Sequence, residues 1–493
     1  MNYYIGVDLG TSSMKMMLVN ADGEICKSVT EEYKVFYPQS GWSEQNAEDW
    51  WQALIKGMKV LTDNLDSELI KGIGVAGQMH GLVVLDNEDK IIRPTILWND
   101  GRTQKQTDYL NEIIGKDKLS DYTANIAFAG FTAPKLLWMK ENEPENFGKI
   151  SKIMLPKDYI NYCLTGVHCT DYSDASGILA LDVKNKCWSK EMLSICSVTE
   201  EQMPKLYESY EVVGKILPSV AELLNLNSET VVVAGAGDNA AAAIGTGTVG
   251  EGKCNVSLGT SGTAFISSDK FSLPEENSLH SFCHADAGFH LMGCILSAAS
   301  CNKWLCDEIF KSNDYKTLEG NIKDDKLGKN ELYFLPYLMG ERSPINDTDA
   351  TGMFIGLRPY TTREDMHQAV LEGVAFAIRD NLEVAKKLGI KIEESCLCGG
   401  GGKSKLWQKI LCNILDIRLK IPTFEEGPGF GAVLLAMVGA QEYPDLNSAI
   451  EKFVSFKDTV EPDKTLVKLY EERYQKYRKI YPAVKQLYKE IKE

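Results

Sequence analysis

The chain has 493 residues, 44% of them hydrophobic and 25% charged, which is the composition of a globular protein with two to four domains. Its formal net charge of -16 argues against nucleic acid or an anionic membrane surface as a partner. No apolar run of about 20 residues is present, and the 13 cysteines lack a regular spacing, so we expect free thiols, a cytoplasmic location and no membrane segment. The sequence leaves the oligomeric state open, a homodimer included.

The first predicted element is a β-hairpin with a polar tip. Apolar positions before Asp8 lead into a polar tip with a turn at Asp8–Ser12, and a mostly apolar run, 14–19, follows it. The tip offers backbone N–H groups and hydroxyls that can bind a phosphate. Asp8 lies at the same tip, where it serves either as a turn residue or as a carboxylate that orients Mg²⁺.

A helix is expected from Ala47 to Leu65, and three strands follow it. Polar groups come at the ends of these strands: Gln78, Met79 and His80 after the first, and residues 99–102 after the last. Ligands of α/β proteins bind at such strand ends, so we expect a binding site here. The three strands are expected at 70–76, 82–85 and 95–98.

Helical segments and short turns are predicted for 103–229, and a buried strand of β-branched residues for 230–234. Asp238 follows that strand and opens an alanine-rich helix. Its carboxylate is suited to accept a proton from a substrate hydroxyl, or simply to cap the helix, and one residue can do both. The glycine-rich stretch 245–252 is expected to be the hinge between two domains.

The second half of the chain repeats the first hairpin. Leu258–Ser261 has the same four residues as Leu9–Ser12 and is again followed by an apolar run. Two such hairpins predict two related domains that face each other across a cleft, with Thr11 and Thr260 on the same phosphates. The later elements are expected as a strand near 290–292, helices at 297–310 and 363–388, a strand at 395–398, a glycine turn at 399–402, helices from 405 and 429, and an amphipathic helix over 464–491 split or kinked at Pro482.

Several other motifs match known patterns only in part. Gly235 and Gly237 with Ala240 resemble a dinucleotide fingerprint, and 397–404 resembles a P-loop without its first glycine. The stretches 245–250 and 247–254 have the wrong context or the wrong last residue for these motifs. His280 and His284 would share one face of a strand, but the sequence supplies no further ligand to complete a zinc site.

The chain resembles the FGGY carbohydrate kinases of the actin/hexokinase-like ATPase superfamily. The paired hairpins, Gly237-Asp238-Asn239 and the late glycine turn carry the resemblance, together with further stretches in family order along nearly the whole chain. These stretches are 42–45, 77–81, 96–102, 131–135, 155–159, 171–177, 280–284 and 340–344.

The resemblance implies an α/β fold of two actin-like, ribonuclease H-like domains facing a central cleft. The first domain, 1–245, would bind sugar, and the second, 253–493, would bind nucleotide, with C-terminal helices that pack on either domain. Asp238 would be the general base, and Asp8 would position Mg²⁺ or the phosphates of ATP. The resemblance further implies Met79, His80, Trp98, Asp100, Asp238 and Asn239 in sugar binding, and Gly10, Thr11, Ser12, Lys15, Gly259, Thr260, Gly400, Gly401 and Ser404 in nucleotide binding.

Within this family, the motif Gln78-Met79-His80 resembles the motif found at this place in the branch that phosphorylates pentuloses. The expected reaction is transfer of the γ-phosphate of ATP to O5 of D-xylulose, with Mg²⁺ as cofactor. Two alternatives remain on the same fold: a kinase for another pentulose such as ribulose, and a non-catalytic sensor that binds ATP and sugar.

Overall fold

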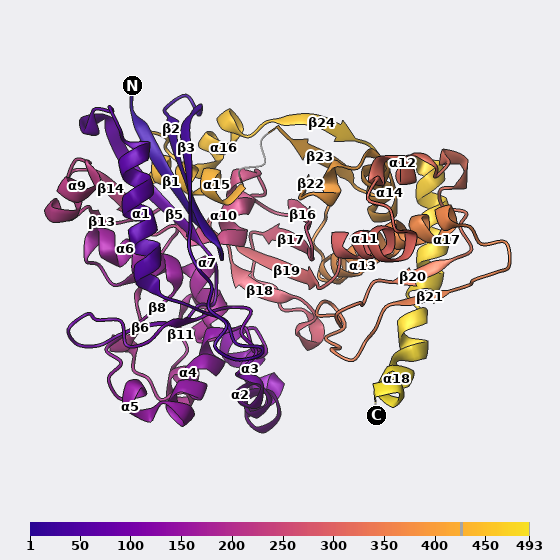
Figure 1. The fold of residues 1–493 in the computed structure, drawn as a ribbon, viewed down its shortest axis with the longest axis horizontal. Coiled ribbons are helices and arrows are strands. Elements are labelled where there is room, and N and C mark those ends of the chain that lie inside the picture. The colour runs from indigo at the N-terminus through magenta and orange to yellow at the C-terminus, as the bar shows by residue number, and fades with distance from the viewer. Residues whose placement is uncertain (424–426, 493) are drawn as a thin grey trace. The chain divides into compact units, whose positions relative to one another are not determined.

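The computed structural model describes residues 1–423 and 427–492, which form two compact units (Figure 1). The first unit comprises Met1–Val249, Ser281–Phe289 and 427–454. The second comprises Gly250–His280, 290–423 and 455–492. The first change of unit falls inside the predicted hinge, whereas the two returns to the first unit depart from a simple division into an N-terminal and a C-terminal half.

A mixed sheet forms the centre of the first unit, in the order β13-β14-β5-β1-β2-β3, with β15 beside β5. Strand β1 is antiparallel to β2 and parallel to β5, as the predicted hairpin requires. The strands of this sheet are β1 (Tyr3–Leu9), β2 (Ser13–Asn20), β3 (Ile25–Glu32), β5 (Ile70–Gly77), β13 (Val212–Lys215), β14 (Val231–Val233) and β15 (Ala236–Gly237). Shorter pairs form around it: β4 (Glu44–Gln45), β6 (Val83–Leu85), β7 (Thr95–Ile96), β8 (Lys152–Met154), β9 (Cys169–Asp171), β10 (Leu181–Asp182), β11 (Cys187–Trp188) and β12 (Lys205–Tyr207).

Helices cover both faces of this sheet. Helix α1 begins at Ala47, where the Asn46 side chain caps it, and buries Trp50, Leu54 and Met58 against the sheet. The region 103–229 also contains short strands, which apolar periodicity over so few residues did not reveal. The α-helices of the unit are α1 (Ala47–Leu61), α2 (Gln104–Asp108), α3 (Lys116–Thr123), α4 (Thr132–Asn142), α5 (Pro144–Phe147), α6 (Pro156–Thr165), α7 (Tyr172–Ala175), α8 (Lys190–Cys196), α9 (Pro218–Leu224), α10 (Asp238–Gly245), α15 (Gly427–Gly439) and α16 (Leu446–Phe453).

The second unit repeats the pairing order of the first. Its sheet runs β24-β23-β22-β16-β17-β19, with an antiparallel hairpin β16-β17 beside parallel β22 and β23 and antiparallel β24. This matches β13-β14-β5-β1-β2-β3 strand for strand, so the prediction of two related domains is confirmed. The strands are β16 (Cys254–Leu258), β17 (Gly262–Ser268), β19 (Phe289–Ile295), β20 (Tyr333–Leu335), β21 (Met353–Ile355), β22 (Glu394–Cys398), β23 (Arg418–Pro422) and β24 (Phe456–Val460). Most of a further strand, β18 (His280–Cys283), belongs to the first unit.

Long helices build the core of the second unit. Thr362 and Asp365 form a capping box at the start of α13, as a helix of this length favours. The α-helices are α11 (Ala299–Trp304), α12 (Tyr315–Gly320), α13 (Arg363–Lys387), α14 (Lys405–Leu415), α17 (Lys464–Tyr477) and α18 (Ile480–Lys492). Short 3₁₀ or π segments in the two units are η1 (Ser67–Leu69), η2 (Tyr109–Gly115), η3 (Ser176–Ile178), η4 (Glu200–Gln202), η5 (Glu275–Asn277), η6 (Leu305–Phe310), η7 (Asp324–Lys326) and η8 (Gly401–Lys403).

Helix α15 belongs to the first unit because its backbone approaches that unit's sheet and helix α10 too closely for side chains. A Cβ built on Gly431 would lie 1.9 Å from the Ala241 carbonyl oxygen, and one on Gly74 would lie 2.1 Å from that of Ala432. The helix packs against α10, β1 and β5. The sequence analysis assigned this helix to the second domain. Its small residues indicate that it packs closely on another element, but they do not show which sheet that element belongs to.

The segment 281–289 also belongs to the first unit through polar contacts. Asn125 donates to the Ser281 carbonyl oxygen (2.8 Å), and Cys283 N donates to Ser176 Oγ (3.0 Å). Lys186 donates to the carbonyl oxygen of Ala287 at 2.8 Å.

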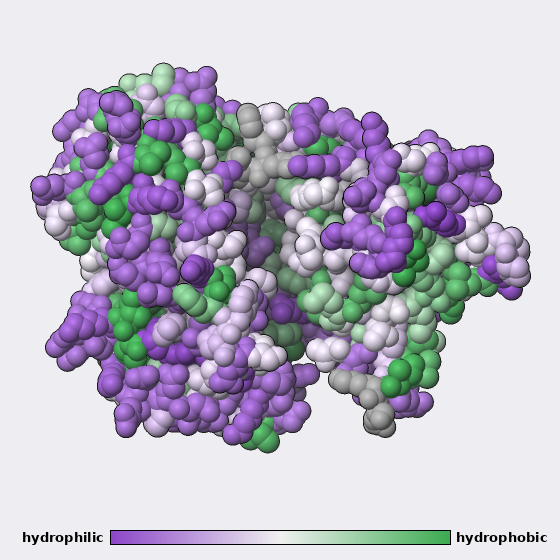
Figure 2. All heavy atoms as spheres, in the orientation of Figure 1, coloured by the Kyte–Doolittle hydropathy of each residue, from purple (hydrophilic) through white to green (hydrophobic). Residues whose placement is uncertain are grey.

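The C-terminal helices dock on the second unit, the alternative that the sequence left open. Tyr470 and Arg473 of α17 bond to the buried Glu372 of α13, at 3.0 and 2.8 Å. The expected split falls between α17 and α18, with Pro482 in the first turn of α18. Hydrophilic side chains cover most of the visible surface (Figure 2). None of the helices in the part of the chain that the structure describes is both long and apolar enough to cross a bilayer.

We expect Gly431→Ala to destabilise the first unit by about 1–3 kcal/mol, because its new methyl group would overlap the α10 backbone. The melting temperature of the purified variant measures this. Gly320→Ala is the matched control: a Cβ there meets no atom within 4 Å, and its helix should tolerate or favour alanine. Equal melting temperatures for both variants would contradict the close packing of α15 on α10.

Candidate active site

Three strands of the first sheet end at the same level. Leu9 of β1 and Gly237 of β15 are both register partners of Gly77 of β5. Asp8, the 78–80 loop and Asp238 therefore gather at one edge of the sheet. The carboxyl ends of parallel strands are where α/β proteins bind ligands.

A pair of glutamines, neither of which was predicted to act in this way, holds the first hairpin tip against this edge. Gln45 Nε2 donates to the carbonyl oxygen of Thr11 (2.6 Å), and Gln78 Nε2 donates to Gln45 Oε1 (2.9 Å). Gln78 N donates in turn to the Leu9 carbonyl oxygen at 2.8 Å. Within the tip, Gly10 N bonds to the Ser13 carbonyl oxygen at 3.0 Å. The only signal in the sequence was that Gln45 lies in a stretch shared with the family.

Asp238 is the first residue of α10, and Gly237, not Asp238, is its N-cap. The partly exposed Asp238 carboxylate accepts hydrogen bonds from Asn239 N (2.7 Å) and Asn239 Nδ2 (3.0 Å). Burial raises the pKa of Asp238 to about 7, and the nearby Asp8 carboxylate adds to the rise. A carboxylate with a pKa near neutrality is suited to general-base catalysis.

His80 has a strained backbone that many contacts hold in place. Its φ of 69° is left-handed, which is uncommon for a residue other than glycine and concentrates at functional sites. His80 Nδ1 lies 2.8 Å from the Gly177 carbonyl oxygen, which assigns the ring hydrogen to Nδ1 and a lone pair to Nε2 in the neutral ring. The ring stacks on Phe131 with centroids 4.7 Å apart. Lys135 Nζ donates to the His80 carbonyl oxygen at 2.7 Å.

Lys135 was not predicted as a site residue. Its ammonium group is buried, and burial lowers its pKa well below the ordinary value, while Asp100 raises it. Its two acceptors are the carbonyl oxygens of His80 and Gly130. The lysine therefore fixes the loop that carries His80 from a helix more than fifty residues away.

The two remaining sugar-site candidates differ in their surroundings. Trp98 is 47% exposed, and its Nε1 donates to Thr11 Oγ1 at 3.0 Å, which links its loop to the hairpin tip. Asp100 is buried, and both of its oxygens are engaged: Ser43 N donates to one (2.6 Å), and Arg102 donates to both (2.9 and 2.7 Å). This geometry favours a supporting role for Asp100 over the expected sugar contact.

The second unit has a cavity of about 1010 Å³ at the end of its own hairpin, large enough for a nucleotide. Thr260, Gly400, Gly401 and Ser404 line it, as predicted for the nucleotide site. Gly399 turns the chain there with a φ of 84°. The remaining lining includes Asn302, Tyr315, Glu319, Lys403 and Trp407, which the sequence analysis did not identify.

The predicted residues thus form one group in each unit. At the edge of the first sheet or next to it are Asp8, Gly10, Thr11, Ser12, Lys15, Met79, His80, Trp98, Asp238 and Asn239. In the second unit, Gly259 and Thr260 lie at the β16-β17 tip, and Gly400, Gly401 and Ser404 follow β22. That Thr11 and Thr260 bind the same ATP stays a prediction.

The chemistry of the first-unit edge is compatible with Mg²⁺. Among residues 1–423 and 427–492, no three His, Cys, Asp or Glu side chains cluster as a metal site, and this includes the region of His280 and His284. Mg²⁺, however, usually binds through one or two carboxylates together with substrate phosphates and water. Asp8, beside a phosphate-sized turn, fits that pattern.

A sheet of this order, repeated in two units with carboxylates at one edge, defines the two-domain actin-like ATPase fold. Residues 3–245 match the model of the N-terminal domain of the FGGY family of carbohydrate kinases, and 254–440 match that of its C-terminal domain. Since these matches cover most of the chain, the chain belongs to the FGGY family of carbohydrate kinases.

Full-length relatives carry the names of particular sugar kinases. The chain is 40% identical to the xylulose kinase of Escherichia coli K12 over 480 residues, 97% of this chain and 98% of that protein. It is 36% identical to the xylulose kinase of Staphylococcus xylosus, covering 98% of this chain and 100% of that protein.

Solved structures agree on the fold. A xyloylose kinase from Brucella ovis superposes with a TM-score of 0.93 at 38% identity, over 99% of this chain and 100% of that chain. A gluconate kinase from Lactobacillus acidophilus also reaches 0.93, at 26% identity and 99% coverage of both chains.

We expect Asp238→Asn to raise the melting temperature at about pH 8 and to raise it less at about pH 5. The pKa of Asp238 is raised in the folded chain, so its stability contribution is lost as pH rises through about 7. Asparagine cannot ionise and avoids this loss. Asp86→Asn is a control in which the pKa shift has the opposite sign. N–H groups of Lys90 and Glu88 lower the pKa of that exposed carboxyl, so asparagine there removes a favourable charge instead of an unfavourable one. A gain in melting temperature for Asp238→Asn that does not depend on pH would contradict the raised pKa of Asp238.

Proposed function

We propose that this chain phosphorylates D-xylulose at O5 with ATP. The observation that carries the proposal is Asp238, a carboxylate with a pKa near 7 that lies beside Asp8 and the 78–80 loop at one sheet edge. The names and near-complete coverage of the relatives support xylulose as the sugar. A gluconate kinase has the same fold, so the fold alone does not identify the sugar.

The reaction needs one proton acceptor and a stabilised phosphoryl group. Asp238 takes the proton of the O5 hydroxyl as O5 attacks the γ-phosphorus, and the bond from that phosphorus to the β-phosphate bridging oxygen breaks to release ADP. The backbone N–H groups of the hairpin tip and Lys15 offer positive charge to the phosphates. When bound at Asp8, Mg²⁺ would neutralise the charge of the β- and γ-phosphates.

Besides Asp238, the sugar is proposed to contact four residues of the first unit. His80 Nε2 accepts a hydrogen bond from a sugar hydroxyl, since Nδ1 is committed to Gly177. The Asn239 side chain adds a polar contact, and Met79 an apolar wall. The half-exposed Trp98 ring covers the sugar while its Nε1 holds Thr11. The adenosine is proposed to occupy the second-unit cavity over Gly400, Gly401 and Ser404.

A cytoplasmic location is part of the same proposal. All 13 cysteines are free in the structure, and eight of them are buried. Free thiols in such number are typical of a reducing compartment, which is also where ATP is available.

We expect Asp238→Ala to lower kcat roughly 100- to 10,000-fold, the usual effect of removing a positioned base. The Kd for D-xylulose should change much less. A coupled ADP-release assay with D-xylulose and with ribulose measures kcat and separates the two pentulose candidates. Turnover within a few-fold of the parent would remove the base assignment, and ATP and sugar binding without any turnover of the parent would favour the sensor.

We expect His80→Ala to raise the KM for D-xylulose roughly 5- to 150-fold, the equivalent of a lost hydrogen bond worth about 1–3 kcal/mol. The KM for ATP should stay nearly constant. His168→Ala is the matched control, since that partly buried histidine bonds to the Ile153 carbonyl oxygen, in a different part of the unit. Equal losses for sugar and ATP, with a lowered melting temperature, would make His80 a core residue.

A further inference from the structure

We infer that Ser173 is a positioning residue for phosphoryl transfer, because its hydroxyl ties the backbone just before Asp238 to a buried ionic cluster built on Lys157. The inference rests on the proposed role of Asp238 as the base. It gives a role to the stretches 155–159 and 171–177, which carry the family resemblance but, apart from the Gly177 carbonyl oxygen on His80, supply no group to the site described above.

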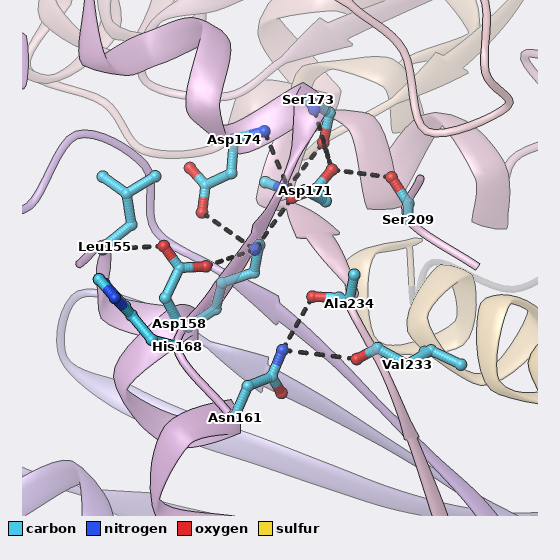
Figure 3. Close-up of polar contacts among 12 residues, drawn as sticks. Leu155, Asp158, Asn161, His168, Asp171, Ser173, Asp174, Ser209, Val233 and Ala234 are labelled. Atoms are coloured by element: carbon cyan, nitrogen blue, oxygen red, sulfur yellow. Dashed lines mark hydrogen bonds and ion pairs between the residues drawn. The ribbon is translucent and has the colours of Figure 1, made fainter. Parts of the chain in front are cut away.

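The cluster contains Lys157, Asp158, Asp171 and Asp174, whose side chains are all 0% exposed. Figure 3 labels its three aspartates. Lys157 Nζ lies 2.8 Å from Asp158 Oδ1, 2.9 Å from Asp171 Oδ1 and 3.8 Å from Asp174 Oδ2. Burial by itself lowers the pKa of Lys157, but the three aspartates raise it well above the ordinary value, so the ammonium stays charged. Charges buried this completely persist only where they are paired, and removing one partner is strongly destabilising. The cluster is therefore a rigid fixed point.

Asp174 is the third carboxyl of the cluster and the farthest from Lys157, with its Oδ2 3.8 Å from Nζ. Neither of its oxygens has a hydrogen-bond partner among the described residues. Burial raises its pKa well above the ordinary value, while the Lys157 ammonium lowers it. The charge of Asp238 adds to the rise, which places Asp174 within electrostatic range of the base.

A chain of hydrogen bonds leads from the cluster to the base. Asp171 Oδ2 accepts from Ser173 Oγ (2.5 Å) and from Ser209 Oγ (2.7 Å), as Figure 3 shows. The Ser173 hydroxyl gives its hydrogen to Asp171, so its oxygen is available as an acceptor, and Gly237 N donates to it at 3.2 Å. Gly237 caps the helix that begins with Asp238.

The position of Asp238 depends on such a backbone contact because the preceding glycine has no side chain to pack. A Cβ at Gly237 would lie 3.0 Å from Met79 Cγ, so a larger residue there would press on the Met79 side chain. The same segment also reaches the other side of the site, since the Gly177 carbonyl oxygen bonds to His80 Nδ1 at 2.8 Å. Residues 171–177 thus set the base and the sugar-binding histidine at a fixed separation. A misplacement of about 1 Å can lower a rate about 100-fold.

The test compares Ser173→Ala with Ser209→Ala. Both serines are buried, and each variant removes one hydroxyl donor from the same Asp171 oxygen, so both should lose thermal stability, Ser173→Ala somewhat more because Gly237 N also loses its acceptor. Only Ser173→Ala releases Gly237 N. We expect kcat for D-xylulose phosphorylation to fall about 10- to 100-fold in Ser173→Ala, with the KM for ATP nearly unchanged, whereas Ser209→Ala keeps kcat close to the parent.

Calorimetric titration with D-xylulose counts the sugar sites that remain folded. A stoichiometry near the parent value with a lowered kcat supports positioning, and a kcat loss that merely follows lost sites overturns it. Equal kcat values for the two alanine variants also overturn it.

If Ser173→Ala does not fold, Ser173→Cys keeps the volume with a weaker acceptor, and parent-like turnover there overturns the inference. Asp238→Asn is assayed alongside, because parent-like turnover in that variant defeats the proposed base and not the Ser173 contact.

Discussion

The first unit depends on holding two like charges, Asp8 and Asp238, close together at a partly buried edge of the sheet. Their repulsion and the desolvation of Asp238 both favour the protonated acid, which is why its pKa reaches about 7. Such an arrangement persists only if the surrounding structure leaves the carboxylates no room to separate. The common register of β1, β5 and β15 and the glutamine contacts at the hairpin tip provide that constraint from one side. The N-terminus of α10 favours the ionised form and limits the rise.

The two units share a sheet topology and differ in the loops at the strand ends. Both carry an antiparallel hairpin beside parallel strands, so both present a tight polar tip at the same place in the topology. The first unit adds carboxylates and the left-handed His80, whereas the second adds a glycine turn and a cavity of nucleotide size. The differences lie in loops at strand ends, which change without disturbing the sheet.

The sequence predicted those parts of the site that depend on local chemistry. Turn residues marked both hairpin tips, and the order strand, glycine, acid, helix marked Asp238. What escaped prediction acts across long separations: Gln45 bonds to Thr11, 34 residues away, and Lys135 bonds to His80, 55 residues away. The engagement of Asp100 by Arg102 and the return of α15 to the first sheet also depend on tertiary packing. The apolar periodicity of a segment shows that one of its faces is buried, but not which other surface it packs against.

The return of 427–454 to the first unit has a consequence for how this chain is made. A ribosome releases residues 1–249 long before it reaches α15, so the nascent first sheet waits without the helix that covers one of its apolar faces. During that interval the exposed strands are open to wrong partners, including the similar sheet that emerges next. Gene fragments cut at the family boundary near residue 245 would keep that face uncovered permanently. A recombinant first half therefore needs the later helix supplied, for instance by a circular permutation that places it in the same continuous stretch.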